Sequence, residues 1–165
     1  MHERKRALEA AGEWGRDAFG RGSNDATRGW QKAARADFEG HSFDRVANFS
    51  ALIFPGDVWF TTTTFGRGVE FGGATFGDDA EFGGATFGDY AEFGGATFGG
   101  GAVFRDATFV GRAEFEGATF VGGAGFAFAK FGGYVGFGGA TFGAHARFGG
   151  ATFGGGAVFR DATFV

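Results

Sequence analysis

The sequence contains no cysteine, and it has very little proline, methionine, leucine or isoleucine. Among 165 residues there are one Pro, one Met, two Leu and one Ile. The absence of cysteine excludes disulfides and thiolate metal sites within the chain. The shortage of large aliphatic side chains excludes the mixed aliphatic core of an ordinary domain, so other side chains must provide the packing.

Long apolar runs are also missing. No window approaches 18 uninterrupted apolar residues, so the sequence predicts no membrane span. Residues 1–6 are basic, but Glu9, Glu13, Arg16 and Asp17 follow where a secretory signal needs an apolar stretch. We therefore expect a cytoplasmic protein.

Positive charge is scarce in most of the chain. Residues 1–37 hold eight Lys or Arg against six Asp or Glu, whereas residues 38–165 hold seven against thirteen. Phosphate binding needs a clustered cationic face, which this balance does not favour. The sequence thus predicts no nucleic-acid partner.

Glycine and phenylalanine are abundant, with 36 and 26 copies, and the phenylalanines are periodic. Intervals of five and six alternate without a slip, which defines a unit of eleven residues that occurs twelve times. Only Phe19 and Phe128 fall outside the series. The periodic positions are Phe38, Phe43, Phe49, Phe54, Phe60, Phe65, Phe71, Phe76, Phe82, Phe87, Phe93, Phe98, Phe104, Phe109, Phe115, Phe120, Phe126, Phe131, Phe137, Phe142, Phe148, Phe153, Phe159 and Phe164.

A small residue, most often Ala, stands two positions before most of these phenylalanines. Side chains two apart share one face of a strand, so both residues point inward and the residue between them, often Thr or Glu, points outward. Gly pairs such as Gly94 and Gly95 follow, and they suit sharp corners that need a positive φ. Each unit therefore predicts very short strands joined by turns.

The segments Ala-Thr-Phe-Gly-Gly and Ala-Glu-Phe-Gly-Gly resemble the Ala-x-Leu/Phe-x-x unit of pentapeptide-repeat proteins. The resemblance covers about three-quarters of the chain and implies an all-β solenoid, a right-handed quadrilateral β-helix with the Phe inside. The chain departs from the family pattern by a sixth residue in every second repeat, and by outward Thr or Glu where Asp or Asn is usual.

The eleven-residue unit leaves two possible coils, one made of two units and one made of a single unit. We favour two units, which gives about 22 residues per coil, because a coil of one unit is too narrow for two aromatic rings.

The resemblance divides the chain into residues 1–37 and a β-helix over residues 38–165. In the first part, Leu8, Trp14 and Phe19 are compatible with a short helical cap that covers the exposed sheet edge. A basic contact for a membrane or partner is the alternative. Residues 149–165 repeat residues 94–110 letter for letter and encode no second cap. We therefore expect either a homodimer through the uncapped C-terminal coil or a longer repeat array.

Chemistry-bearing residues are sparse. His2, His41 and His145 have no companion at metal-ligand spacing, so no metal site is predicted. Glu70, Glu92 and Glu114 are spaced two units apart and would form one column, which is typical of a solvated acidic face. We predict no cofactor and no catalytic site. The chain is not expected to be an enzyme.

Aromatic residues at three corners break the glycine pattern. With two units per coil, Tyr90, Arg112 and Tyr134 would share one corner and could form a cation–π stack, with Phe128 one corner away. Exposed aromatics with Arg are typical of protein-binding hot spots. We therefore predict a non-catalytic scaffold that binds an unidentified protein through these four residues.

Two other functions stay open. The family resemblance implies that the chain could be an acidic mimic of DNA that binds a type II topoisomerase. Columns of outward threonines could instead bind ice, although β-branched Thr is also simply a good strand residue. The columns are Thr75, Thr97, Thr119, Thr141 and Thr163, and Thr64, Thr86, Thr108 and Thr152, the second interrupted by Lys130.

Overall fold

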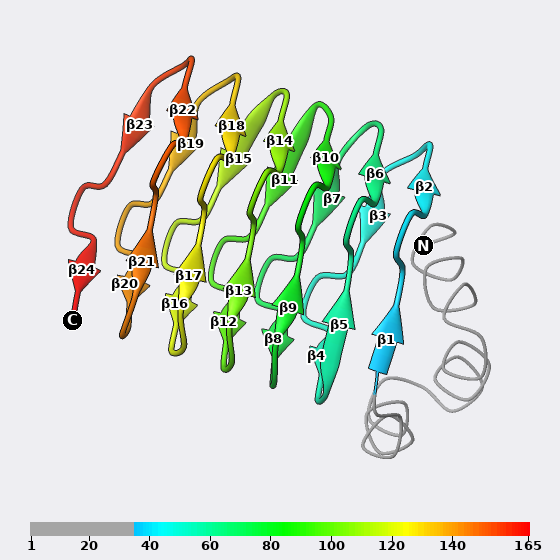
Figure 1. Cartoon of the computed structure of the whole chain (residues 1–165), viewed down its shortest axis with the longest axis horizontal. Helices are drawn as coiled ribbons and strands as arrows, with labels where there is room; N and C mark the ends of the chain where they lie inside the picture. The colour runs from blue at the N-terminus through cyan, green and yellow to red at the C-terminus, as the bar shows by residue number, and fades with distance from the viewer. Residues whose placement is uncertain (1–34) are drawn as a thin grey trace.

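The computed structural model describes residues 35–165 and shows a parallel β-solenoid of four six-stranded sheets (Figure 1). The expected helical cap falls in residues 1–34, outside the described range. Strand β1 begins at Arg35, three positions before the first periodic Phe, and it pairs with β5 (Asp57–Trp59). The four-sided solenoid predicted from the repeat is confirmed.

The chain visits the four sheets in a fixed order, so that each coil contributes one strand to each sheet. Sheet A contains β1 (Arg35–Asp37), β5 (Asp57–Trp59), β9 (Ala80–Glu81), β13 (Ala102–Val103), β17 (Ala124–Gly125) and β21 (Ala146–Arg147). Sheet B contains β2 (Ser42–Phe43), β6 (Thr64–Phe65), β10 (Thr86–Phe87), β14 (Thr108–Phe109), β18 (Lys130–Phe131) and β22 (Thr152–Phe153).

The other two sides of the solenoid are built in the same way. Sheet C contains β3 (Ala47–Asn48), β7 (Val69–Glu70), β11 (Tyr90–Glu92), β15 (Arg112–Glu114), β19 (Val135–Gly136) and β23 (Ala157–Val158). Sheet D contains β4 (Ile53–Phe54), β8 (Thr75–Phe76), β12 (Thr97–Phe98), β16 (Thr119–Phe120), β20 (Thr141–Phe142) and β24 (Thr163–Phe164).

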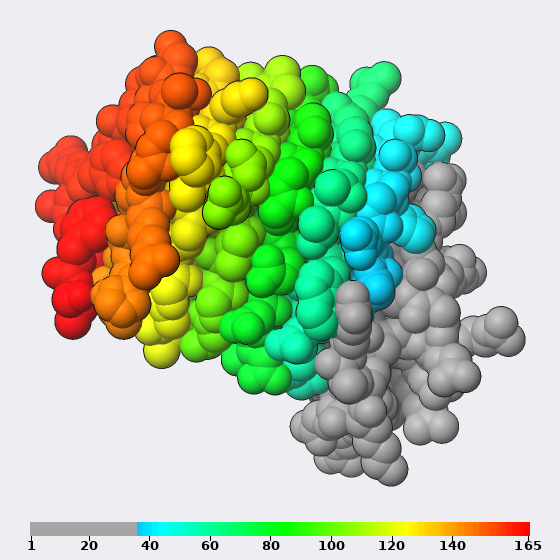
Figure 2. Space-filling model, viewed as in Figure 1, coloured from blue at the N-terminus to red at the C-terminus, as the bar shows by residue number. Residues whose placement is uncertain are grey.

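The register fixes the coil at two eleven-residue units, because partners such as Asn48 and Glu70 stand 22 positions apart. Each strand pairs in parallel with the strand four places further along the chain, and the coils appear in Figure 2 as successive bands of colour. A coil of one unit would instead pair neighbouring units, so the wider of the two expected coils is confirmed.

The interior consists of four columns of phenylalanine rings. Rings of register partners in successive coils stack nearly parallel, with centroids from 4.4 Å apart for Phe87 and Phe109 to 5.4 Å for Phe65 and Phe87. This spacing follows from the hydrogen-bonded distance of about 4.8 Å between parallel strands. Rings of the columns beside sheets A and C, on opposite sides of the coil, meet edge to face, as Phe93 and Phe104 do at 89°. Edge-to-face contact is a favoured geometry for aromatic pairs, and it locks the columns together.

Small inward residues fill the space between the rings. Ala80, Ala102 and Ala124 are buried at this position in sheet A. Thr63 occupies the equivalent place beside sheet B and is the one buried polar residue among residues 36–165. Its hydroxyl donates a hydrogen bond to the Phe38 carbonyl at 2.8 Å, which satisfies the buried group.

Glycines at the corners have two different physical roles. Gly95 has a φ of +64°, and a Cβ there would meet nothing within 4 Å, so only its backbone conformation requires glycine. Gly111 has no positive φ, but a Cβ there would overlap the carbonyl of Asp89 in the preceding coil. The second role, close approach of adjacent coils, was not evident from the sequence.

The phenylalanine rings become exposed at the end of the solenoid, where no further coil stacks on them. The rings are buried up to Phe142, whereas Phe153 and Phe164 near the end of the chain are 38% and 57% exposed. Only one neighbouring coil covers them. Residues 35–165 include no helix of the length and apolar character that a bilayer crossing requires.

Replacing Phe93 by Ala should lower the free energy of unfolding by about 3–5 kcal/mol, because it leaves a cavity in a ring column. Phe93 is fully buried and stacks on Phe71 and Phe115. The matched control is Thr97→Ala, an outward position of the next strand, where less than about 1 kcal/mol should be lost. Urea unfolding measures both, and equal losses would contradict an interior built on the rings.

The two glycine roles are separable by alanine substitution. Gly95→Ala should cost about 1–2 kcal/mol, the cost of a side chain in the left-handed region. Gly111→Ala should cost more, since the Asp89 carbonyl is backbone and cannot move aside without disturbing the coil contact. Thermal and urea unfolding of the two variants provide the comparison. A smaller loss for Gly111→Ala would show that coils do not approach this closely.

Candidate partner-binding surface

The corner between sheets B and C holds three of the four residues predicted to bind a partner. Tyr90 and Arg112 are register partners in β11 and β15, and Tyr134 immediately precedes β19. The Ala113 amide donates to the Tyr134 carbonyl at 2.9 Å, which places Tyr134 beside Arg112 in the next coil. The structure therefore aligns these three residues in one column.

The side chains of this column divide into two groups. The Arg112 guanidinium lies 5.4 Å from the centre of the Tyr134 ring and forms an ion pair with Glu114. Tyr90 points toward the preceding coil instead, where its hydroxyl donates to Glu70 Oε1 at 3.2 Å and its ring covers Gly68. Burial, together with the negative charge of Glu70, raises the pKa of Tyr90. The expected three-membered stack is thus present only as the Arg112–Tyr134 pair.

Phe128 lies at the corner between sheets A and B and forms a second pair of the same kind. Its side chain is 51% exposed, and its φ is +58°. Its ring lies over Gly150, and the Arg105 guanidinium approaches to 5.5 Å from the ring centre. Sequence reasoning missed Arg105, because its separation from Phe128 is one position longer than the coil repeat.

Lys130 lies between these two corners. It is the exposed outward residue of β18, the sheet B strand that connects the Phe128 corner to the Tyr134 corner. The sequence marked it only as an interruption in a threonine column. We call Arg105, Arg112, Phe128, Lys130 and Tyr134 the aromatic–cationic surface.

Carboxylates gather on the adjoining sheet C. Glu70, Glu92 and Glu114 are register partners in successive coils, as their spacing predicted. Burial raises the pKa of Glu92, a hydrogen bond from the Gly94 amide opposes this, and the charges of Glu114 and Glu116 raise it further. Within residues 35–165, no three His, Cys, Asp or Glu side chains are placed to hold a metal ion.

The two threonine columns are in register as expected, one on sheet B and one on sheet D. Since the coil passes through sheets A, B, C and D in turn, B and D are opposite sides of the solenoid. The columns therefore do not form adjacent ranks on one flat surface. Each sheet carries a single row of outward threonines.

A family model for pentapeptide repeats in nine copies matches residues 49–97 and, in an overlapping match, residues 82–130. Together with the four-sheet coil built from two units, this match decides the family. The chain is a pentapeptide-repeat protein. A comparison with curated proteins finds no match.

The family assignment clarifies which positions are unusual. In a pentapeptide-repeat protein the central residue of each repeat fills the coil, and here that residue is Phe from Phe38 to Phe164. Phe128 is the one phenylalanine outside the repeat within residues 35–165, and it points outward. The repeat itself does not account for its presence.

Glu92 predicts a specific pH dependence of stability. Because its pKa in the folded chain lies above 4.5, the folded state binds more protons than the unfolded state just above that pH. Stability is therefore lost as the pH rises from 4.5 through the folded pKa. Glu92→Gln stays neutral, and its amide oxygen can still accept from Gly94, so the variant should avoid this loss.

Urea unfolding of both proteins at about pH 4 and about pH 7 measures the effect. The stability of Glu92→Gln relative to wild type should increase with pH. A relative stability that is constant or decreases with pH would contradict the crowding of carboxylates on sheet C.

Proposed function

We propose that this pentapeptide-repeat protein is a non-catalytic scaffold whose aromatic–cationic surface, together with Tyr90, binds a protein partner. The observation that carries the proposal is Phe128, a large apolar side chain that is half exposed on a corner with a positive φ. The positive φ is unfavourable for such a bulky side chain in the free protein.

The residues at this corner share a positive φ, at a cost that depends on the side chain. Gly84 and Gly150 adopt it without a steric cost, and Asp106 has a short polar side chain that tolerates it. Thr62 also has a side chain at a φ of +56°, but Phe128 is the one large apolar residue at this corner, and its ring lacks a compensation in the free protein. Contact with a partner would supply one, because it would bury the ring.

The composition of the surface supports protein binding. Arg105 and Arg112 each lie over an aromatic ring, and Tyr134 is 36% exposed. Aromatic and Arg side chains dominate the binding energy of protein interfaces, and rigid rings lose little entropy when they are buried. The two corners are joined by one short strand, so a single partner segment can contact both.

The filled interior supports a non-catalytic role. Phenylalanine rings occupy the centre of every coil from residue 38 to residue 142, which leaves no enclosed space where a substrate could be separated from water. Chemistry on this scaffold would be confined to its outer faces.

The acidic column of sheet C favours a second candidate, a mimic of DNA that binds a type II topoisomerase. Glu70, Glu92 and Glu114 place negative charge at one strand spacing along the solenoid. This function requires competition with DNA for the topoisomerase, and a triple Glu→Gln variant of the column should lose that competition. Phe128 lies on the corner between sheets A and B, away from the carboxylate column of sheet C, so Phe128→Gly should not affect the competition.

The proposed function predicts that Phe128→Gly with Tyr134→Ala abolishes capture of the partner from a lysate of the source cell. Phe128→Gly removes a side chain from a strained backbone conformation, so this substitution should not lower the stability of the fold. Tyr134→Ala changes an exposed position. Quantitative affinity capture with the immobilised full chain provides the measurement. Proteins retained by wild type should be depleted at least tenfold by the double variant.

Val121→Ala is the matched control, since Val121 is a similarly exposed apolar side chain on the corner between sheets D and A. It should capture the same proteins as wild type. Equal capture by the double variant would show that the aromatic–cationic surface is not the contact region. If the double variant and Val121→Ala lost capture equally, the loss would not be specific to the aromatic–cationic surface, and the proposal would also be contradicted.

A further inference from the structure

The outer face of sheet A carries an ordered sequence of charge. Its outward residues in four consecutive strands, β9, β13, β17 and β21, are Glu81, Val103, Gly125 and Arg147. The register pairs them directly, so they form one column across four coils. The column therefore begins with an acidic residue, continues with an apolar residue and a glycine that has no side chain, and ends with a basic residue.

A second column beside it repeats the order. Asp79, Gly101, Gly123 and His145 directly precede the same four strands. The amides of Ala80, Ala102 and Ala124 donate to the carbonyls of Gly101, Gly123 and His145 at 2.8 Å, which aligns these residues. The acidic end of both columns lies in one coil, and the basic end lies three coils away.

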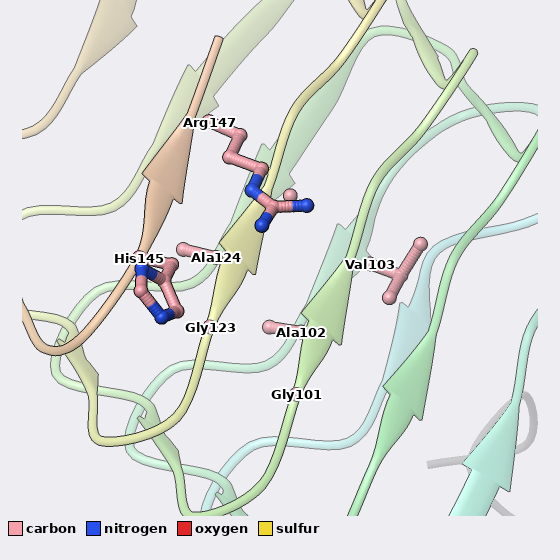
Figure 3. Close-up of a pocket in the computed structure, with 8 residues that line it drawn as sticks. Gly101, Ala102, Val103, Gly123, Ala124, His145 and Arg147 are labelled. Atoms are coloured by element: carbon pink, nitrogen blue, oxygen red, sulfur yellow. The ribbon is translucent and has the colours of Figure 1, made fainter.

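A shallow depression of about 270 Å³ lies between the two ends. Figure 3 shows His145 and Arg147 on β21 at one side, Val103 on β13 at the other, and the glycine backbone between them. Gly125 has no positive φ, and a Cβ there would meet only ordinary contacts. Neither conformation nor crowding explains the glycine, which leaves a hollow beside the projecting Val103.

Charge at the two ends is not balanced within the chain. Burial raises the pKa of Glu81, and the negative charges of the nearby Asp79 and Asp57 raise it further. Among the salt bridges formed within residues 35–165, none includes Glu81 or Arg147. Arg147 and His145 are exposed. Each end thus lacks the opposite charge that the other end carries.

We propose that this face binds the same face of a second copy of the chain, about a two-fold axis parallel to the strands and between β13 and β17. Such a rotation reverses the order of the coils but keeps each residue's position along the strand. Glu81 then faces Arg147 of the second copy, and Asp79 faces His145. Val103 faces the hollow at Gly125.

The symmetry selects a second copy as the occupant. A two-fold axis forms every contact twice, so one complementary column becomes a self-complementary surface. An axis along the solenoid would instead set each coil against itself, with Glu81 against Glu81 and Arg147 against Arg147. Like charges oppose that arrangement, so the charge order favours the reversed one.

The contact is small. Four parallel strands at about 4.8 Å spacing span about 14 Å, well below the dimensions of a standard stable interface. We therefore expect a dimer that forms in concentrated solution, dissociates on dilution and weakens as salt screens the charges at its rim.

Charge reversal tests the proposal with the full chain in analytical ultracentrifugation over a concentration series at low salt. Wild type should associate, whereas Glu81→Arg alone and Arg147→Glu alone should both lose association, because each creates like-charge contacts twice. An equimolar mixture of the two single variants should associate again, since every contact between them is complementary. Gly125→Leu should also abolish association by filling the hollow that receives Val103.

Arg67→Glu is the matched control, a charge reversal at an exposed residue on the corner between sheets B and C that should leave association unchanged. Circular dichroism verifies that each variant is folded. A monomeric wild type at all concentrations would overturn the proposal, and so would single variants whose mixture fails to associate. A dimer unaffected by Glu81→Arg would also overturn it, by placing the contact elsewhere, such as at the C-terminal coil.

Discussion

The hydrogen-bond distance between parallel strands determines nearly everything else in this molecule. It fixes the separation of successive coils and, through them, the separation of phenylalanine rings within each column. Rings at this distance fill the interior without gaps, as Phe98 does between Phe76 and Phe120. A chain with two leucines and one isoleucine can therefore bury a continuous core. No single coil is stable alone, because each ring column depends on the coils above and below it.

This construction confines function to the surface. Inward positions are occupied by Phe and small residues, and most corners must be glycine to satisfy either the backbone conformation or the close approach of coils. The positions free to vary are the outward strand residues and a few corners. The aromatic–cationic surface, the acidic column of sheet C and the charge order of sheet A all arise at such positions. Because the register aligns them, residues one coil apart in sequence become neighbours and build patches that no single repeat contains.

The sequence predicted the fold to the level of individual contacts between strands. The alternation of five and six indicated the inward positions, and ring size favoured a coil of two units over a coil of one. Tyr90, Arg112 and Tyr134 therefore fell into the same column in the structure as in the prediction. Side-chain direction could not be predicted in this way. Tyr90 turns toward Glu70 in the preceding coil, and Arg105 reaches Phe128 diagonally, outside the strict repeat.

The sequence also could not predict which glycines are required by the close approach of coils. Gly111 and Gly95 look alike in a Gly-rich repeat and differ only in their surroundings. Strand β1 begins at Arg35, before the first periodic Phe, because a periodic Phe marks an inward residue and not the beginning of a strand. The charge order of sheet A was not predicted for a related reason. Its charge order becomes visible only when residues from four coils are read as one column.

The central claim is that two eleven-residue units advance the chain by one strand spacing over a stacked aromatic core. Ile53 and Thr141 are outward residues of sheet D in β4 and β20, four coils apart. Since the chain has no cysteine, Ile53→Cys with Thr141→Cys can carry two spin labels, and pulsed electron paramagnetic resonance measures their separation. The account predicts a narrow distribution centred at about 19 Å between the backbone positions, four spacings of about 4.8 Å. A separation of about 38 Å, which coils of a single unit would produce, or a broad distribution would contradict it.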